Sequence, residues 1–362
     1  MSEPRGRVLS WLCSIASPTG EEQQLCAALL ERVRSARGGL NVRRHGDSLL
    51  VVLGAPSHEA PHVLLAGHLD TVRTQHDGPV RTEGDRLYGP GAADMKSGLA
   101  LMLELIESTA PLPPLGLTLA FYAGEEGPFE HNQLELILDD GLLRAHRPDF
   151  AICLEPSDNT LQLGCMGTLH ARVTFEGRTA HSARPWQGDN ALYRAIPFLD
   201  ELSRLAPVHH DIDGLRYTEV TTATMAQGGT GRNVVPGSFW VNVNHRFPPG
   251  VSIDAAIDRV RGLVAGRAQI EVVDAAPSAL PHRNHALVQA LVDSGATEIA
   301  AKQAWTDVGR LAARGIPAVN FGPGVQAQAH QRNEWTSLEQ LDRGWEILSR
   351  WLARASATGR PA

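Results

Sequence analysis

The sequence of 362 residues lacks several features that mark particular classes of protein. Its 33 Lys+Arg against 40 Asp+Glu give a formal net charge of −7, so it has no basic excess of the kind that binds nucleic acid or an anionic membrane. No stretch approaches the roughly 20 apolar residues of a membrane-spanning helix. The N-terminal segment carries an acidic residue and no uninterrupted apolar run, unlike a secretory signal. We therefore expect a cytoplasmic protein with no nucleic-acid or membrane partner.

Cysteine and lysine are also scarce. The four cysteines, Cys13, Cys26, Cys153 and Cys165, show no CxxC spacing and lie in apolar segments. This pattern favours buried thiols over a disulfide framework. Only two of the 33 basic residues are lysines, which we interpret as a general bias toward arginine and not as a binding patch.

What the sequence does contain is an alternation of buried strands and helices. Its 362 residues, at about 150 residues per domain, suggest two domains. Apolar strands are expected within 62–70, 115–127, 147–159 and 315–324, two short strands within 41–54, and helices at 17–36, from about 95, at 285–296 and at 337–355. Ser17 and Thr19 are expected to cap the first of these helices. The pattern predicts an α/β fold with a mixed, mainly parallel sheet flanked by helices.

Between residues 167 and 277 the pattern changes. Four segments alternate apolar and polar residues, as half-exposed strands do, and two helical segments separate them. We therefore predict an inserted α+β domain at 167–277, within a first domain made of 1–166 and 278–362.

Six acidic or histidine side chains occupy comparable places in the first domain. Four directly follow predicted strands: His68, Glu125, Glu126 and Glu155. Asp94 lies in a Gly-rich loop at the start of a helix, and His330 lies beyond the last predicted strand. Ligands of open α/β sheets bind beyond the carboxyl ends of the strands, so these side chains are expected to converge in one crevice. Each has an ordinary explanation when taken singly, such as a loop histidine, a solvated glutamate or a helix N-cap. Their shared position favours a common site.

The composition of this group favours a metal centre. Carboxylates that converge would raise one another's pKa values unless a cation lay between them. Imidazole and carboxylate ligands suit Zn²⁺ and related divalent ions. Five ligands with one shared carboxylate would give each of two ions three ligands, which is a two-metal hydrolytic arrangement.

Two further assignments follow from side-chain direction. Residues two apart on a strand face the same side, so the carboxylate of Asp70 could accept a ring N–H of His68. Neighbours on an extended chain point in opposite directions. One of Glu125 and Glu126 could therefore bind metal while the other acts as the general base.

Five motifs then identify a family resemblance. "GHLDTV", "YGPGAADMKSG", "AGEEG", "LEP" and "AHQRNEW", in this order, resemble the M20 family of dinuclear zinc aminoacylases and exopeptidases. The resemblance implies two Zn²⁺ per subunit, replaceable by Co²⁺ or Mn²⁺. It implies that Asp94 bridges the ions, that His68 and Glu155 complete one site, and that Glu126 and His330 complete the other.

The same resemblance assigns the remaining roles. Glu125 would be the general base, with Asp70 behind His68, and the peptide bond between Asp94 and Met95 would be cis. The inserted domain would be a lid through which two copies form a homodimer. His181 of this lid would reach the active site of the partner copy and help to hold the oxyanion.

Five residues are implied to contact the substrate, a small N-acyl amino acid. Asn233 and Arg246 match lid positions that contact a substrate carboxylate, and Gly322 and Gly324 match positions that line the pocket. Thr306 follows Trp305 at a place where related desuccinylases have two small hydroxyl residues.

Within the family, "RTAHSARPWQGDNA", "HHDIDGLRYTEV" and "AWTDVGRLAARGIPAVNFGPG" resemble succinyl-diaminopimelate desuccinylases of the actinobacterial type. The chain departs from other desuccinylases at "GCMGTL", where they have an arginine. Another deacylase activity, toward acetylornithine or an N-acyl-lysine, and a small carboxypeptidase therefore stay open. So does a non-catalytic metal-binding protein. A two-metal phosphoesterase fits less well because no phosphate-binding loop accompanies the carboxylates.

Overall fold

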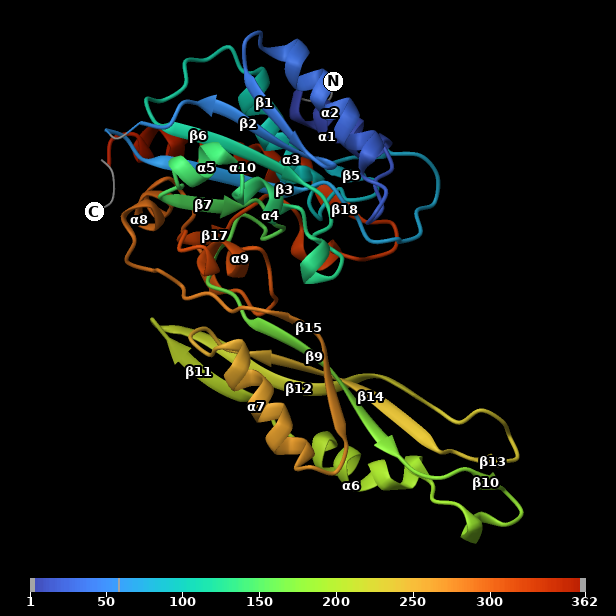
Figure 1. Cartoon of the computed structure of the whole chain (residues 1–362). Coiled ribbons are helices and arrows are strands. Elements are labelled where there is room, and N and C mark those ends of the chain that lie inside the picture. The colour runs from blue at the N-terminus through green and yellow to red at the C-terminus, as the bar shows by residue number, and fades with distance from the viewer. Residues whose placement is uncertain (1–3, 58, 359–362) are drawn as a thin grey trace. The chain divides into compact units, whose positions relative to one another are not determined.

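The computed structural model describes residues 4–57 and 59–358, which form two compact units (Figure 1). Unit 1 comprises Met1–Gly164, Pro281–Ala300 and Thr306–Ala362, and unit 2 comprises Cys165–Leu280 and Ala301–Trp305. The functional domain boundaries predicted from the sequence, at 166/167 and 277/278, stay a prediction.

Unit 1 is built on an eight-stranded sheet in the order β1-β2-β6-β3-β7-β17-β8-β16. The strands are β1 (Asn41–His45), β2 (Ser48–Gly54), β3 (His62–His68), β6 (Gly116–Tyr122), β7 (Phe150–Cys153), β8 (Leu161–Leu163), β16 (Ile299–Ala301) and β17 (Ala318–Asn320). The central strands β6, β3, β7 and β17 are parallel, whereas β2 joins β6 and β8 joins β17 in antiparallel pairs. Every residue of β3, β6 and β7 is buried, as expected for parallel strands covered on both faces.

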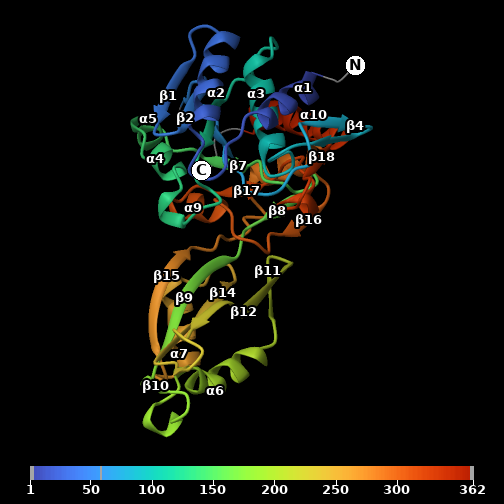
Figure 2. The same ribbon diagram turned by 90° about the vertical axis from the view of Figure 1, so that its right-hand side faces the viewer.

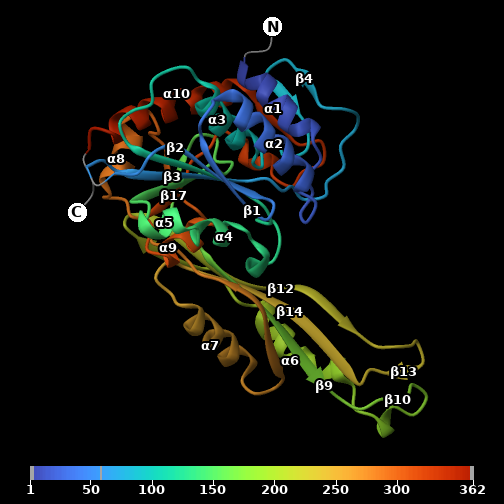
Figure 3. The same ribbon diagram turned by 45° about the horizontal axis from the view of Figure 1, so that its top comes forward.

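Helices cover both faces of this sheet. They are α1 (Pro4–Ser14), α2 (Gln23–Ala36), α3 (Lys96–Glu107), α4 (Leu134–Leu138), α5 (Gly141–Ala145), α8 (Ala286–Asp293), α9 (Val308–Ala313) and α10 (Leu338–Ala355). Figure 3 shows α1, α2, α3 and α10 on one side of the sheet and α4, α5 and α9 on the other. The α/β architecture predicted for this part of the chain is confirmed.

Shorter elements complete unit 1. A three-stranded sheet has the order β18-β5-β4, formed by β4 (Arg81–Glu83), β5 (Arg86–Tyr88) and β18 (Trp335–Ser337). Two single 3-10 turns are η1 (Phe129–His131) and η3 (Gln326–Gln328).

The predicted start of the first helix is wrong. A helix, α1, precedes it, and α2 begins only at Gln23, with no side-chain hydrogen bond at its N-cap. The Ser17 hydroxyl instead donates to the carbonyl of Leu69 at 2.7 Å, and the Thr19 hydroxyl donates to Asp70 Oδ2 at 3.2 Å. These two hydroxyls bind the chain that leaves β3, because that chain offers buried acceptors.

Unit 2 is an antiparallel sheet with two helices on one face. Its strands have the order β11-β12-β14-β9-β15 and can be followed side by side in Figure 2. They are β9 (Gly167–Glu176), β11 (Val208–Ile212), β12 (Leu215–Gly228), β14 (Ser238–Phe247) and β15 (Gln269–Ala276), with a small pair β10 (Ala180–His181) and β13 (Val234–Val235). Alternate residues of β9 and β14 pack against α6 (Ala191–Ser203) and α7 (Ile253–Val264), and a 3-10 turn, η2 (Pro185–Gln187), precedes α6.

The inserted α+β fold is as predicted, but the number of strands is not. The main sheet has five strands because β11 is an additional edge strand. Its sequence, VHHDI, is largely exposed and has only two apolar residues, Val208 and Ile212, with His210 between them on the same face, so periodicity did not reveal it.

The structure also describes the state of the cysteines and the length of the apolar helices. All four cysteines are buried and none forms a disulfide, as expected. Among the described residues, no helix is both long and apolar enough to cross a membrane.

Candidate active site

The site lies where neighbouring parallel strands of unit 1 end. Since β3 pairs in parallel with both β6 and β7, the carboxyl ends of the three strands lie at one edge of the sheet. His68 is the last residue of β3 and is buried. Glu125 and Glu126 follow β6, and Glu155 follows β7 and is 5% exposed. These four residues therefore follow strands that end at one edge of the sheet, as the sequence predicts.

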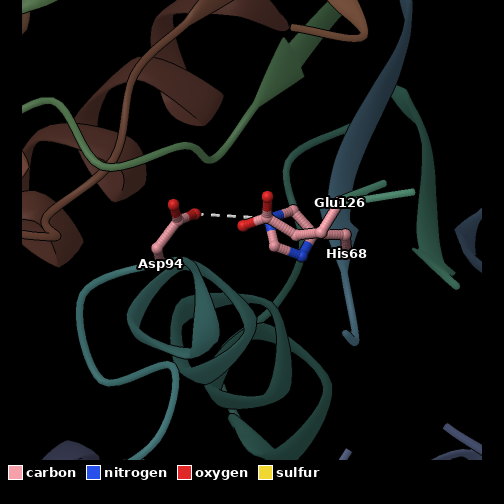
Figure 4. A group of neighbouring side chains, drawn as sticks. All are labelled: His68, Asp94 and Glu126. Carbon is pink, nitrogen blue, oxygen red and sulfur yellow. Dashed lines mark hydrogen bonds and ion pairs between the residues drawn. The ribbon is translucent and has the colours of Figure 1, made fainter. Parts of the chain in front are cut away.

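Asp94 approaches the same edge from the Gly-rich loop before α3. Its Oδ1 lies 3.3 Å from Nε2 of His68, and its Oδ2 lies 3.5 Å from Nε2 of His330. His330 Nε2 also lies 2.9 Å from Oε1 of Glu126. Figure 4 shows His68, Asp94 and Glu126 pointing toward one another, and one ligand atom from each lies within 4.8 Å of the others. The peptide bond between Asp94 and Met95 is cis, as the family resemblance implies.

The charges of these groups strongly perturb one another. Burial and then the charge of Glu155 raise the pKa of Glu125 well above its usual range. Hydrogen bonds with Asp94 and Glu126 raise the pKa of His330 to about 10. Although burial opposes it, bonding to His330 and His68 holds the pKa of Asp94 below its usual range. Carboxylates outnumber the two imidazoles here, and the oxygen and nitrogen atoms of these groups fit divalent metal ions as ligands.

Asp70 has a wider structural role than the one predicted. The Nδ1 atom of His68 lies 2.9 Å from the backbone carbonyl oxygen of Asp70 and 3.5 Å from its carboxylate. The Asp70 carboxylate accepts the backbone N–H groups of Glu125 and Glu126 at 3.0 and 2.9 Å. Asp70 therefore holds both the imidazole of His68 and the backbone of the glutamate pair.

The physical reason given for separating the two glutamates is wrong. Glu125 and Glu126 lie in a turn and not in an extended chain, so their directions do not follow from strand alternation. The turn, fixed by Asp70, brings Glu126 to His330 and leaves Glu125 beside the charge of Glu155.

One buried carboxylate was missed by the sequence argument. Glu334 is 2% exposed, and its carboxylate accepts the backbone N–H groups of Gly91, Ala93 and Asp94. Burial raises its pKa to about 7. Its signal was its place in the motif AHQRNEW, four residues after His330, and that spacing is equally compatible with a surface carboxylate.

The predicted pocket residues of unit 1 are buried in its interior. A Cβ atom on Gly322 would lie 2.5 Å from the carbonyl oxygen of Glu155, and one on Gly324 would lie 2.1 Å from that of Ala93. Because these glycines have no side chain, the chain after β17 can pack against Glu155, a predicted ligand, and against Ala93, the residue before the predicted ligand Asp94. Thr306 is 3% exposed and precedes α9. Substrate contact by all three stays a prediction.

The other predicted site residues belong to unit 2. His181 is exposed in β10, and its Nδ1 accepts the Ala183 N–H at 3.1 Å. Asn233 is exposed. Arg246 is half-buried in β14, its Nε donates to Asn244 Oδ1 at 3.1 Å, and burial lowers its pKa. Their roles toward a substrate stay predictions.

The strand-end cluster of carboxylates and imidazoles is the kind of site that a metallohydrolase of α/β fold carries. Residues 64–354 match the model of peptidase family M20/M25/M40, and the chain belongs to this family. The family expected from the five motifs is thereby confirmed.

Individual relatives agree with this assignment. A putative succinyl-diaminopimelate desuccinylase of Mycobacterium tuberculosis is 38% identical over 347 residues, which cover 94% of this chain and 96% of the relative. A succinyl-diaminopimelate desuccinylase of Corynebacterium glutamicum is 36% identical over 355 residues, 94% of each chain. Among solved structures, an M20 family metallo-carboxypeptidase from Sulfolobus solfataricus has a TM-score of 0.78 at 15% identity, covering 98% of this chain and 100% of its own, and it shows the shared fold.

Proposed function

We propose that this M20 hydrolase removes the succinyl group from N-succinyl-LL-2,6-diaminopimelate, a step of lysine biosynthesis, and releases succinate and LL-diaminopimelate. The observation that carries the proposal is the identity of 36–38% over 94% of the chain with proteins bearing the desuccinylase name. The cluster around Asp94 supports the hydrolytic part independently, because its ligand atoms suit a divalent metal.

Two Zn²⁺ ions, which Co²⁺ or Mn²⁺ could replace, would be held by five side chains: His68, Asp94, Glu126, Glu155 and His330. Such ions, when bound, polarise a carbonyl group and lower the pKa of a water molecule. Asp94 is the natural shared ligand because its two oxygens face different imidazoles, at 3.3 and 3.5 Å.

Glu125 would carry the proton during amide hydrolysis. Its carboxylate would accept a proton from the attacking water as the oxygen joins the carbonyl carbon. It would then give the proton to the nitrogen as the C–N bond breaks. A base that must later act as an acid benefits from a raised pKa, and burial together with the charge of Glu155 raises that of Glu125.

We infer that unit 2 serves as a lid and joins two copies into a homodimer. Strand β11 pairs with Leu215–Glu219 of β12 only, and the end of β12 from Thr224 to Gly228 is exposed. Helix α6 also exposes Tyr193 and Ile196, by 67% and 51%. An open strand edge and exposed apolar side chains are features of surfaces that pair. His181 of the partner subunit would then supply an oxyanion contact, and the substrate carboxylate would meet Asn233 and Arg246.

A substrate panel tests this function. The full chain, stripped of metal and reloaded with Zn²⁺, is assayed on N-succinyl-LL-diaminopimelate, N-acetylornithine, N-acetyl-lysine and a dipeptide. We expect kcat/KM to be highest on the succinyl substrate, by at least about 100-fold, because recognition of a charged group discriminates strongly. A higher value on another substrate would replace the desuccinylase assignment. A loaded chain that hydrolyses none of them would indicate a non-catalytic homologue.

A further inference from the structure

Glu334 accepts four hydrogen bonds from the loop that ends at Asp94, one of the predicted metal ligands. One of its carboxylate oxygens accepts the N–H of Ala93 at 2.7 Å and that of Asp94 at 2.8 Å, and the other accepts the N–H of Gly91 at 3.0 Å. Its own backbone carbonyl accepts the N–H of Gly89 at 3.1 Å. One residue therefore satisfies four backbone donors of the segment that ends at Asp94.

The same residue belongs to the segment that carries His330. That segment has two non-glycine residues at positive φ, His330 at 61° and Asn333 at 53°, so its backbone needs anchoring contacts. On its exposed side the anchor is Asp77, whose backbone N–H donates to Asn333 Oδ1 at 2.6 Å and whose carboxylate accepts Asn333 Nδ2 at 2.7 Å. On its buried side the anchor is Glu334. Of these two anchors, Glu334 is the one that binds the backbone of Asp94.

We propose that Glu334 is a positioning residue that fixes the Asp94 loop against the His330 segment and so sets the affinity of the centre for the ion that these two side chains share. The proposal rests on the metal centre of the proposed function and is independent of the acyl substrate. A carboxylate suits the role because its ionised form accepts hydrogen bonds at both oxygens. A glutamine of the same shape would keep one acceptor and turn an amide donor toward a backbone N–H.

Glu334→Gln and the matched control Asp77→Asn test the proposal. Each replaces one carboxylate by its amide. The carboxylate of Asp77 binds Asn333 of the His330 segment, whereas that of Glu334, a residue of this segment, binds the N–H of Asp94. Zn²⁺ is added to each metal-stripped, full-length protein in a calorimeter. Loss of a residue that orients a ligand costs roughly 10–100-fold in metal affinity, so we expect that loss for at least one ion in Glu334→Gln. We expect less than about a threefold change in Asp77→Asn.

Excess Zn²⁺ should restore much of the kcat of Glu334→Gln and leave its KM unchanged. The proposal is overturned if Glu334→Gln binds both ions with wild-type affinity, or if Asp77→Asn loses as much affinity as Glu334→Gln. A wild-type affinity accompanied by a lower melting temperature would show a structural role only.

Hydrogen exchange of the wild-type protein provides a test that needs no variant. The amides of Gly91, Ala93 and Asp94 have Glu334 as their acceptor, so we expect them to exchange at least about 100-fold more slowly than exposed loop amides. Exchange at the rate of exposed loops would contradict the proposal. A chain that shows the Zn²⁺ and exchange results but no desuccinylation would contradict the proposed substrate while leaving the role of Glu334 intact.

Discussion

The Oδ1 atom of Asp94 lies 3.3 Å from Nε2 of His68, although 26 positions separate the two residues in the chain. Two ligands of one tetrahedral zinc ion, each about 2.0–2.2 Å from it, are about 3.3–3.5 Å apart. The pair is therefore spaced as two ligands of one ion would be. The other oxygen of Asp94 has a similar relation to His330, at 3.5 Å. A single carboxylate is thus presented to two imidazoles.

We predict that replacing the proposed base, Glu125, lowers turnover but leaves metal binding intact. Glu125→Gln should lower kcat by roughly 10²–10⁴-fold, because the amide cannot accept the proton of water. It should still bind two Zn²⁺ per chain, as measured by elemental analysis after reloading. Glu126→Gln is the control, since it should weaken metal binding itself. Substantial activity in Glu125→Gln would show that another group acts as the base.

Metal binding should release protons and strengthen with pH. In the absence of metal, hydrogen bonds with Asp94 and Glu126 raise the pKa of His330 to about 10, so its ring is protonated at neutral pH. A metal ion binds the neutral ring and must displace this proton. The apparent Zn²⁺ affinity should therefore rise between pH 7 and about 10, approaching tenfold per unit for each proton displaced. Calorimetry in buffers of different ionisation enthalpy measures the proton count, and a count of zero would contradict the prediction.

Gly324→Ala should disturb the loop of Asp94 without touching any ligand. The new Cβ would lie 2.1 Å from the carbonyl oxygen of Ala93 and 2.8 Å from Cβ of Pro156. Overpacking of this kind costs about 1–3 kcal/mol, measurable by urea unfolding, and should also weaken Zn²⁺ binding. Gly262→Ala in α7 is the control, because nothing lies within 4 Å of its Cβ. It should stabilise by about 0.5–1 kcal/mol. Equal effects of the two variants would show that close packing at Gly324 is unimportant.

The cysteines should be unreactive in the folded protein. Burial raises the pKa of Cys13 to about 12 and that of Cys26 to about 11, so neither is a thiolate at pH 8. We expect a chromogenic disulfide reagent to label none of the four thiols in native buffer and all four in guanidinium chloride. Rapid labelling of Cys13 or Cys26 in the native protein would contradict the buried placement.

The sequence was most informative where chemistry depends on strand ends. His68 and Glu155 could be placed because a parallel strand delivers whatever follows it to one edge of the sheet. The turn at Glu125 could not be predicted, since it depends on hydrogen bonds to Asp70, 55 positions away in the chain. Glu334 was missed for the same reason: its partners, Gly91 to Asp94, are some 240 positions away. Long-range anchoring by single carboxylates leaves no periodicity in a sequence.

The paired metal centre is the central claim, and anomalous scattering at the zinc edge from crystals of the reloaded chain tests it most directly. The account predicts two peaks on either side of the Asp94 carboxylate, one adjoining His68 and Glu155 and the other adjoining Glu126 and His330. A single peak, or none near Asp94 in fully reloaded protein, would contradict it.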